Sequence, residues 1–163
     1  MRITAVMVKE LREKTGYGMM ECKKALNETN GDFTKAIEIM NEKAGASFIN
    51  IKNRTANQGV IEAYVHSGSR IGVMLELNCE TDFVANTVEF KTLAKDIAMQ
   101  VVATNPSYVS IDELKDGEDI GSVLMEQQYI KDTNKQIKEI VNEAIKKFGE
   151  NIVIKRFVRY EIH

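Results

Sequence analysis

The first 45 residues carry hydrophobic side chains at helical spacing in three short runs. Thr4 can cap a first helix that ends at Gly16. A second helix begins near Gly18 and stops at Asn30-Gly31, and a third ends before Gly45. The apolar positions of the three runs are Val8 and Leu11; Met19, Cys22, Ala25 and Leu26; and Phe33, Ala36, Ile37, Met40 and Ala44. Because helices of about 10 residues are unstable alone, residues 1–45 are predicted to form one three-helix bundle.

The next stretch favours a linker followed by a β-hairpin. Residues 46–57 lack a clear period and contain several polar or basic side chains, so they are predicted to be a linker. Val60–His66 and Ile71–Cys79 are predicted strands, and Gly68-Ser69 suits a type II′ turn between them. One face of the second strand should be buried; it carries Ile71, Val73, Leu75 and Leu77.

A helix is predicted to cover that face. Asn86 can be its N-cap, with Glu89 at the third helical position, and Asn105-Pro106 ends it. Its apolar stripe consists of Phe90, Leu93, Ala94, Ile97, Ala98 and Val101. Residues 107–132 show no clear period and stay unassigned.

A final helix and strand complete the predicted core. Thr133 and Gln136 resemble a capping box, and Gly149 closes the helix that follows. Residues 151–162 alternate as a third strand, whose apolar face, interrupted by Arg156, carries Ile152, Ile154, Val158 and Tyr160. The order strand, strand, helix, helix, strand predicts an α+β core domain over residues 58–163, with a small antiparallel three-stranded sheet and packed helices.

Composition narrows the class of protein. The chain of 163 residues is 44% hydrophobic and 28% charged with one proline, which is typical of a globular protein. A net charge of -2 does not supply the positive field that non-specific nucleic-acid binding needs. Two cysteines are too few for a disulfide framework. Charges interrupt the first ten residues and no apolar run has membrane-spanning length, so we expect a soluble, unexported protein without direct nucleic-acid or membrane partners.

The sequence lacks the usual motifs of catalysis and cofactor binding. Gly16-Tyr17-Gly18 follows a predicted helix and has Glu21 where a dinucleotide fingerprint needs glycine, and no phosphate-binding loop motif occurs. Metal-ligand spacing is missing among Cys22, Cys79, His66 and His163. Glu80 and Asp82 could form an acid–base pair, but no nucleophile accompanies them. We therefore expect neither an enzyme nor a bound cofactor or metal.

Two hydrophobic features do not fit a buried role easily. Phe83 and Val84 follow the hairpin directly and lie outside the stripe of the next helix, so they either cover the sheet end or form an exposed anchor for a partner. Met19-Met20 are neighbours at a helix start and cannot both face the interior, so one of them should point outward.

Three ordered stretches carry a family resemblance. Residues 8–26 read VKELREKTGYGMMECKKAL and are continued by Asn30-Gly31-Asp32 and Ala36-Ile37; residues 77–86 read LNCETDFVAN; and residues 148–152 read FGENI, followed by Arg159-Tyr160-Glu161. In this order and over nearly the whole chain, they closely resemble the signatures of the elongation factor Ts family.

The resemblance implies a ubiquitin-associated-like helical head and an α+β core of the dimerisation type. It implies that the head binds elongation factor Tu through Arg12, Met19, Met20 and Lys23. The tip, Thr81-Asp82-Phe83-Val84, would intrude near the magnesium and phosphate site of that partner. The implied function is guanine-nucleotide exchange: the chain would bind elongation factor Tu with GDP or without nucleotide, promote GDP release and so regenerate the GTP form.

The chain also departs from longer family members. It resembles a short, single-core form, for which homodimerisation could compensate. Asp96 and Gln100 stand on the core helix where many members have histidines, which puts a partner contact there in doubt. The resemblance implies action in the bacterial cytoplasm, or in an organelle stroma or matrix. The main alternative is an interaction module without exchange activity, because three-helix heads bind many unrelated partners.

Overall fold

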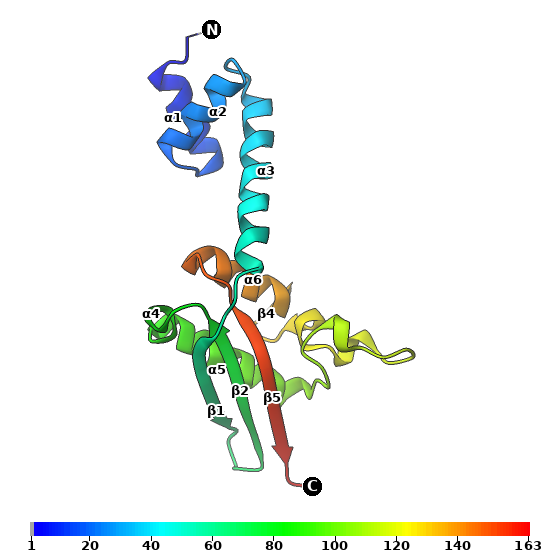
Figure 1. The fold of residues 1–163 in the computed structure, drawn as a ribbon. Coiled ribbons are helices and arrows are strands. Elements are labelled where there is room, and N and C mark those ends of the chain that lie inside the picture. The colour runs from blue at the N-terminus through cyan, green and yellow to red at the C-terminus, as the bar shows by residue number, and fades with distance from the viewer. Residues whose placement is uncertain (1) are drawn as a thin grey trace. The chain divides into compact units, whose positions relative to one another are not determined.

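The computed structural model describes residues 2–163, which divide into two compact units, one up to Asn50 and one from Ile51 to His163 (Figure 1). The helices are α1 (Ala5–Thr15), α2 (Met19–Glu28), α3 (Phe33–Lys52), α4 (Asp82–Ala85), α5 (Val88–Thr104) and α6 (Ile137–Phe148). The strands are β1 (Gln58–Val65), β2 (Ile71–Cys79), β3 (Gln128–Tyr129), β4 (Asp132–Gln136) and β5 (Val153–Glu161).

The first unit is a helical head with its own hydrophobic core. Thr4 caps α1 by accepting a hydrogen bond from the Met7 amide, and Gly16 ends it with a φ of 75°, as the sequence predicts. The buried residues are Val8, Leu11, Cys22, Ala25, Leu26, Ala36 and Met40. The predicted packing of three helices into one bundle is confirmed, whereas the ubiquitin-associated likeness of this head stays a prediction.

The predicted end of the third helix is wrong. α3 continues through Gly45 to Lys52, so most of the predicted linker is helical and only residues 53–57 lack a helix or strand. A glycine inside a helix costs only about 1 kcal/mol relative to alanine. The absence of proline in this stretch leaves that modest cost as the main local obstacle, and the helix therefore runs through it.

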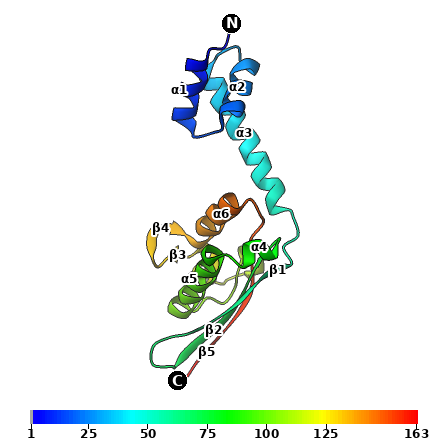
Figure 2. The same ribbon diagram turned by 90° about the vertical axis from the view of Figure 1, so that its left-hand side faces the viewer.

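The second unit is built on an antiparallel sheet of order β1-β2-β5. β1 pairs with β2 from Gln58 opposite Cys79 to Val65 opposite Gly72. Helix α5 lies against one face of this sheet (Figure 2) and buries the predicted stripe except for Leu93, which is partly buried. The Phe90 ring packs edge-on against that of Phe148, with 6.3 Å between the ring centroids. The inward residues of β2 are Val73, Leu75 and Leu77. The predicted α+β fold with a three-stranded antiparallel sheet is confirmed.

A β-bulge changes the predicted face of the last strand. Ile154 pairs with Leu77, but Arg156 pairs with Glu76, so Lys155 is an extra residue on β5. Such an insertion reverses the alternation beyond it. Ile152 and Ile154 are buried as predicted, whereas the prediction for Val158 and Tyr160 is wrong, because they stand 41% and 75% exposed on the opposite face.

Three local predictions are corrected by the backbone. The hairpin turn is not type II′, because Ser69, like Gly68, has a positive φ (57°). The N-cap of α5 is Thr87, whose hydroxyl accepts from the Phe90 amide, rather than Asn86. The N-cap of α6 is Gln136, and Thr133 belongs to β4.

The unassigned stretch 107–132 forms a compact connection of short pieces. It contains 3-10 turns at Ile111–Glu113, Ile120–Ser122 and Leu124–Glu126, followed by β3 and most of the hairpin that β3 forms with β4. Val123 and Leu124 are fully buried and anchor it. Turns of three residues are too short for a helical period to show in the sequence. In the part of the chain that is described, no helix combines the length and apolarity that crossing a bilayer requires.

Candidate functional site

The tip begins where the central strand β2 ends. Thr81 takes an extended conformation and caps α4, and its hydroxyl accepts a hydrogen bond of 3.3 Å from the Val84 amide. After this single turn Thr87 caps the next helix, and its hydroxyl also donates to the Val84 carbonyl at 2.8 Å. Two threonine caps therefore enclose a helix of four residues between the sheet and α5.

The side chains of the tip face different environments. Phe83 is 84% exposed and Asp82 is also exposed, whereas Ala85 is buried and Val84 is partly buried. Phe83 thus does not cover the end of the sheet. Leaving a phenylalanine in water forgoes roughly 1.5–3 kcal/mol of burial free energy, so its exposure in the free chain favours the interpretation as an anchor for a partner.

A network of hydrogen bonds supports the tip from the segment between α6 and β5. The Glu150 carboxylate accepts from the Thr81 amide at 3.1 Å and from the Thr81 hydroxyl at 2.8 Å. The Asn151 amide donates to the Glu80 carboxylate at 2.7 Å, and Arg54 pairs with the same carboxylate at 3.7 Å. Glu80 is therefore engaged in structural contacts that hold the chain just before the tip.

The thiol of Cys79 lies beneath this network. Its Sγ is buried and donates to the Thr81 carbonyl at 3.1 Å. Burial first, and the Glu150 charge second, raise the pKa of the Cys79 thiol. The thiol therefore stays protonated near neutral pH and acts as a hydrogen-bond donor at the base of the tip.

The head presents its candidate residues on the surface. Arg12 on α1 and Lys23 on α2 are exposed, and Met19 and Met20 are 41% and 77% exposed. The prediction that the two methionines cannot both face the interior is confirmed, and both lie outside because the buried face of α2 begins one turn later, at Cys22. Met19 and Lys23 are four residues apart and share one face of α2.

Comparison with known proteins shows which family the chain is similar to. The family model described as "Elongation factor TS" matches residues 4–118. The chain belongs to the elongation factor Ts family. Elongation factor Ts from Thermoanaerobacter sp. is 47% identical, covering 98% of this chain and 94% of that protein. Those from Caldanaerobacter subterraneus and Thermodesulfovibrio yellowstonii are 46% and 45% identical over nearly the whole of both chains.

The chain is shorter than these elongation factor Ts relatives. The alignment with the Thermoanaerobacter protein spans 192 positions, whereas the chain has 163 residues, so at least 29 of the positions have no counterpart here. This agrees with the interpretation as a short form of the family. The family model covers the head, β1, β2, the tip and α5, and β3, β4, α6 and β5, which follow residue 118, complete the core.

Asp96 and Gln100 on α5 serve internal contacts. Gln100 is fully buried; its amide donates to the Gln128 carbonyl at 3.0 Å, and its oxygen accepts from the Ile130 amide at 2.9 Å. Asp96 accepts from the Tyr129 hydroxyl and pairs with Lys131. Both side chains hold the β3–β4 hairpin against α5, and Gln100 presents no surface to a partner.

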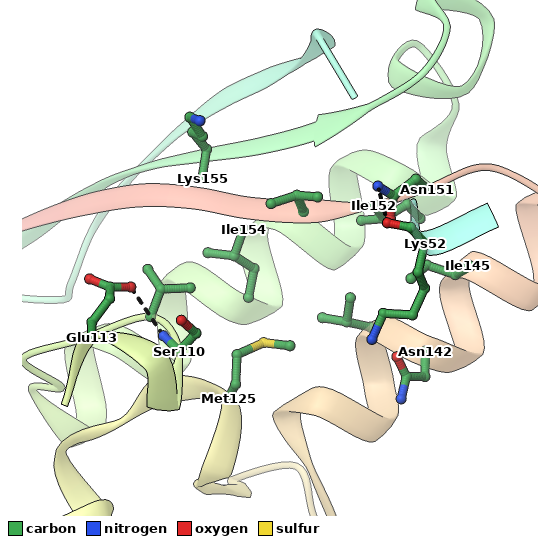
Figure 3. Close-up of a pocket in the computed structure, with 13 residues that line it drawn as sticks. Lys52, Ser110, Glu113, Met125, Asn142, Ile145, Asn151, Ile152, Ile154 and Lys155 are labelled. Atoms are coloured by element: carbon green, nitrogen blue, oxygen red, sulfur yellow. Dashed lines mark hydrogen bonds between the residues drawn. The ribbon is translucent and has the colours of Figure 1, made fainter. Parts of the chain in front are cut away.

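A cavity of about 260 Å³ lies between α6, β5 and the 3-10 turns (Figure 3). Its wall is mostly apolar, and Lys155 points away from it. Asn142 and Lys52 lie on the same side, and the Asn142 Oδ1 atom is buried without a hydrogen-bond partner. The Glu113 carboxylate accepts a hydrogen bond from the Ser110 amide as a turn cap.

Sequence reasoning missed two residues of this site, Glu150 and Asn151. Glu150 lies 69 positions after Thr81, and Asn151 lies 71 positions after Glu80, the residues that they contact. Both residues belong to the third family signature, FGENI, which was the signal that could have found them. Gly149 ends α6 and Ile152 is buried, but neither of these roles needs the carboxylate of Glu150.

Proposed function

We propose that the chain is a guanine-nucleotide exchange factor that binds elongation factor Tu and promotes GDP release. Family membership supports the partner, and the 84% exposure of Phe83 on a supported tip is the observation that carries the role of the tip. In this proposal Arg12, Met19, Met20 and Lys23 bind the GTPase domain of the partner. Asp82 and Phe83, flanked by Thr81 and Val84, disturb its magnesium and phosphate site.

The mechanism is reciprocal weakening of binding rather than bond chemistry. A factor that lowers the affinity of its partner for GDP and magnesium is itself bound more weakly, by the same ratio, when GDP is present. Phe83 wedges between side chains of the partner, and the Asp82 carboxylate perturbs the polar groups around the cation. The chain itself needs no nucleotide site, and it acts wherever elongation factor Tu works, in a bacterial cytoplasm or an organelle.

Release of fluorescently labelled GDP from elongation factor Tu tests the proposal. The unchanged chain should accelerate release, and Phe83→Ala and Asp82→Ala should each reduce that acceleration by about tenfold or more, a loss of roughly 1.4 kcal/mol. Ile120→Ala, a change at a half-exposed hydrophobic residue outside the tip, is the control and should have no effect. Absence of any acceleration by the unchanged chain would reject the proposal.

An interaction module without exchange activity predicts a different result. Such a module would bind elongation factor Tu and leave the rate of GDP release unchanged. Met19→Ala with Met20→Ala should weaken complex formation under either function, because both side chains are exposed on the head. Equilibrium binding and release rates measured on the same variants therefore separate the two functions.

We also propose that the chain forms a homodimer through the outer face of its sheet. This outer face is opposite to α5 and carries five large exposed apolar side chains, Ile61, Val65, Met74, Val158 and Tyr160. Sheets pack face to face when their facing side chains are apolar. Sedimentation of the unchanged chain and of Met74→Lys tests this, since a charge at the central strand should leave a monomer; identical monomeric masses would refute it.

A further inference from the structure

We propose that Glu150 and Asn151 are positioning residues that hold the tip in its partner-binding conformation before the partner arrives. The inference rests on the proposed exchange function and deepens it. The inference gives the third signature, FGENI, a role at the tip, although FGENI and the tip are far apart in the sequence.

The tip cannot hold its own conformation. α4 has four residues, whereas isolated helices shorter than about 12 residues are marginal even with favourable sequences. Its anchor is the small side chain of Ala85, and the large one, Phe83, lies in water. The orientation of Phe83 therefore depends on contacts made by the residues that flank the turn.

Glu150 fixes the first of these residues. Its carboxylate receives both donors of Thr81, the amide and the hydroxyl, so the hydroxyl hydrogen is directed away from α4. The lone pairs of the Thr81 hydroxyl oxygen then face the Val84 amide and accept the hydrogen bond that caps the turn. A carboxylate acceptor makes these hydrogen bonds stronger than neutral ones. Glu150 thus selects the threonine rotamer that starts the tip.

Asn151 fixes Glu80, the residue before Thr81. It is 5% exposed, and its backbone amide donates to Glu80 at 2.7 Å. Both hydrogens of its side-chain amide are used as well, toward the carbonyls of Lys52 and Arg54 at 3.2 and 2.7 Å. Arg54 in turn reaches the Glu80 carboxylate and the Gly149 carbonyl. The chain just before the tip is therefore tied to two other segments of the same unit.

Preorganisation of this kind affects exchange through the tip alone. If the tip has to be ordered during binding, part of the interaction free energy between the tip and the partner is lost to that ordering. We expect Glu150→Ala to slow the GDP release that the chain stimulates at saturating concentration by about tenfold. The affinity contributed by the head should change little, so the maximal rate should fall more than the concentration for half-maximal effect rises.

Glu118→Ala is a closely matched control. The Glu118 carboxylate also accepts one hydroxyl and one backbone amide, from Tyr108 at 2.8 Å and Lys115 at 2.9 Å, but it lies in the stretch 107–132. It should leave exchange unchanged. Thermal unfolding of both variants monitors the fold. If Glu150→Ala fails to fold, Glu150→Gln, which keeps an acceptor oxygen without the charge, should show a smaller loss of rate in the same direction.

Two further measurements test the route by which Glu150 acts. Amide hydrogen exchange of Val84, Ala85 and Asn86 in the free chain should become faster in Glu150→Ala and stay unchanged in Glu118→Ala. In addition, the losses of rate in Glu150→Ala and Phe83→Ala should be less than additive in the double variant, because only Asp82 is then left for Glu150 to position.

The failure of this inference is distinct from that of the proposed function. If the unchanged chain does not stimulate GDP release, the exchange function itself is wrong. If it does, and Glu150→Ala stimulates release equally well or leaves amide exchange in α4 unaltered, the positioning role is refuted. Fully additive losses in the double variant would also refute it, because they would mean that Glu150 acts independently of Phe83.

Discussion

Replacing Gln100 by leucine should destabilise the chain without impairing its binding surface. The change removes the partners of the Gln128 carbonyl and the Ile130 amide, which Gln100 contacts at 3.0 and 2.9 Å. A polar group left without its hydrogen bond costs about 1–3 kcal/mol. Since Gln128 and Ile130 are exposed residues whose backbones water can partly reach, the lower end applies, about 1 kcal/mol each.

The imperfect fit of a branched side chain in a fully packed position adds up to roughly 1 kcal/mol. The expected loss is therefore about 2–3 kcal/mol, which lowers the melting temperature of a chain of this size by roughly 6–10 °C. Urea unfolding followed by circular dichroism measures it. Gln128→Leu, at an exposed side chain, is the control and should stay within about 0.5 kcal/mol of the unchanged chain.

Two outcomes would refute this reasoning. A free energy of unfolding within about 0.5 kcal/mol of the unchanged chain would mean that the hydrogen bonds of Gln100 contribute nothing net. A folded Gln100→Leu that stimulates GDP release tenfold less at 20 °C would mean that this position affects the partner after all. The structure predicts neither, because Gln100 is fully buried beneath the β3–β4 hairpin.

Two glycines and a tyrosine give further expectations. Gly59→Ala should cost more than about 3 kcal/mol in urea unfolding, because its Cβ would lie 2.1 Å from the Leu77 carbonyl oxygen on the central strand; a loss below 1 kcal/mol would contradict this. Gly45→Ala should instead stabilise α3 by up to about 1 kcal/mol, since its Cβ meets no atom within 4 Å, and any destabilisation would count against the continuous helix. Burial, with the Asp96 charge beside it, raises the pKa of Tyr129 to about 12 from an ordinary value near 10. The resulting stability is complete below pH 10 and is lost as pH rises toward 12, so Tyr129→Phe should flatten alkaline unfolding curves over that range, and an unchanged curve would refute the assignment.

The sequence predicted most of what depends on local period. The bounds of β2, the apolar stripe of α5 and the cap of α1 all follow from spacing and from residue types, and the structure has them as expected. The end of α3 was missed because Gly45 resembles a helix terminator, although one glycine is a modest cost in a helix that is otherwise favourable.

The remaining features depend on contacts that local pattern does not encode. The bulge at Lys155 is set by pairing with β2, and Glu150 reaches Thr81 across 69 positions. The exposure of Phe83 was likewise undecided, since the same residues could have covered the sheet end. Family resemblance indicated the tip, but only the folded chain shows which side chains hold it.

The extra residue Lys155 exchanges the inward and outward positions along the rest of β5. Upstream of it Ile154 points inward, and downstream Phe157 and Arg159 do so, leaving Val158 and Tyr160 outside. The Arg159 guanidinium then reaches the Val102 carbonyl at 3.0 Å, where the last turn of α5 has carbonyls without helical partners. Deleting one residue would exchange the two rows, withdrawing that cation from the helix end and placing two apolar side chains beneath it. A single insertion thus decides both how α5 is closed and which residues the sheet offers to its surroundings.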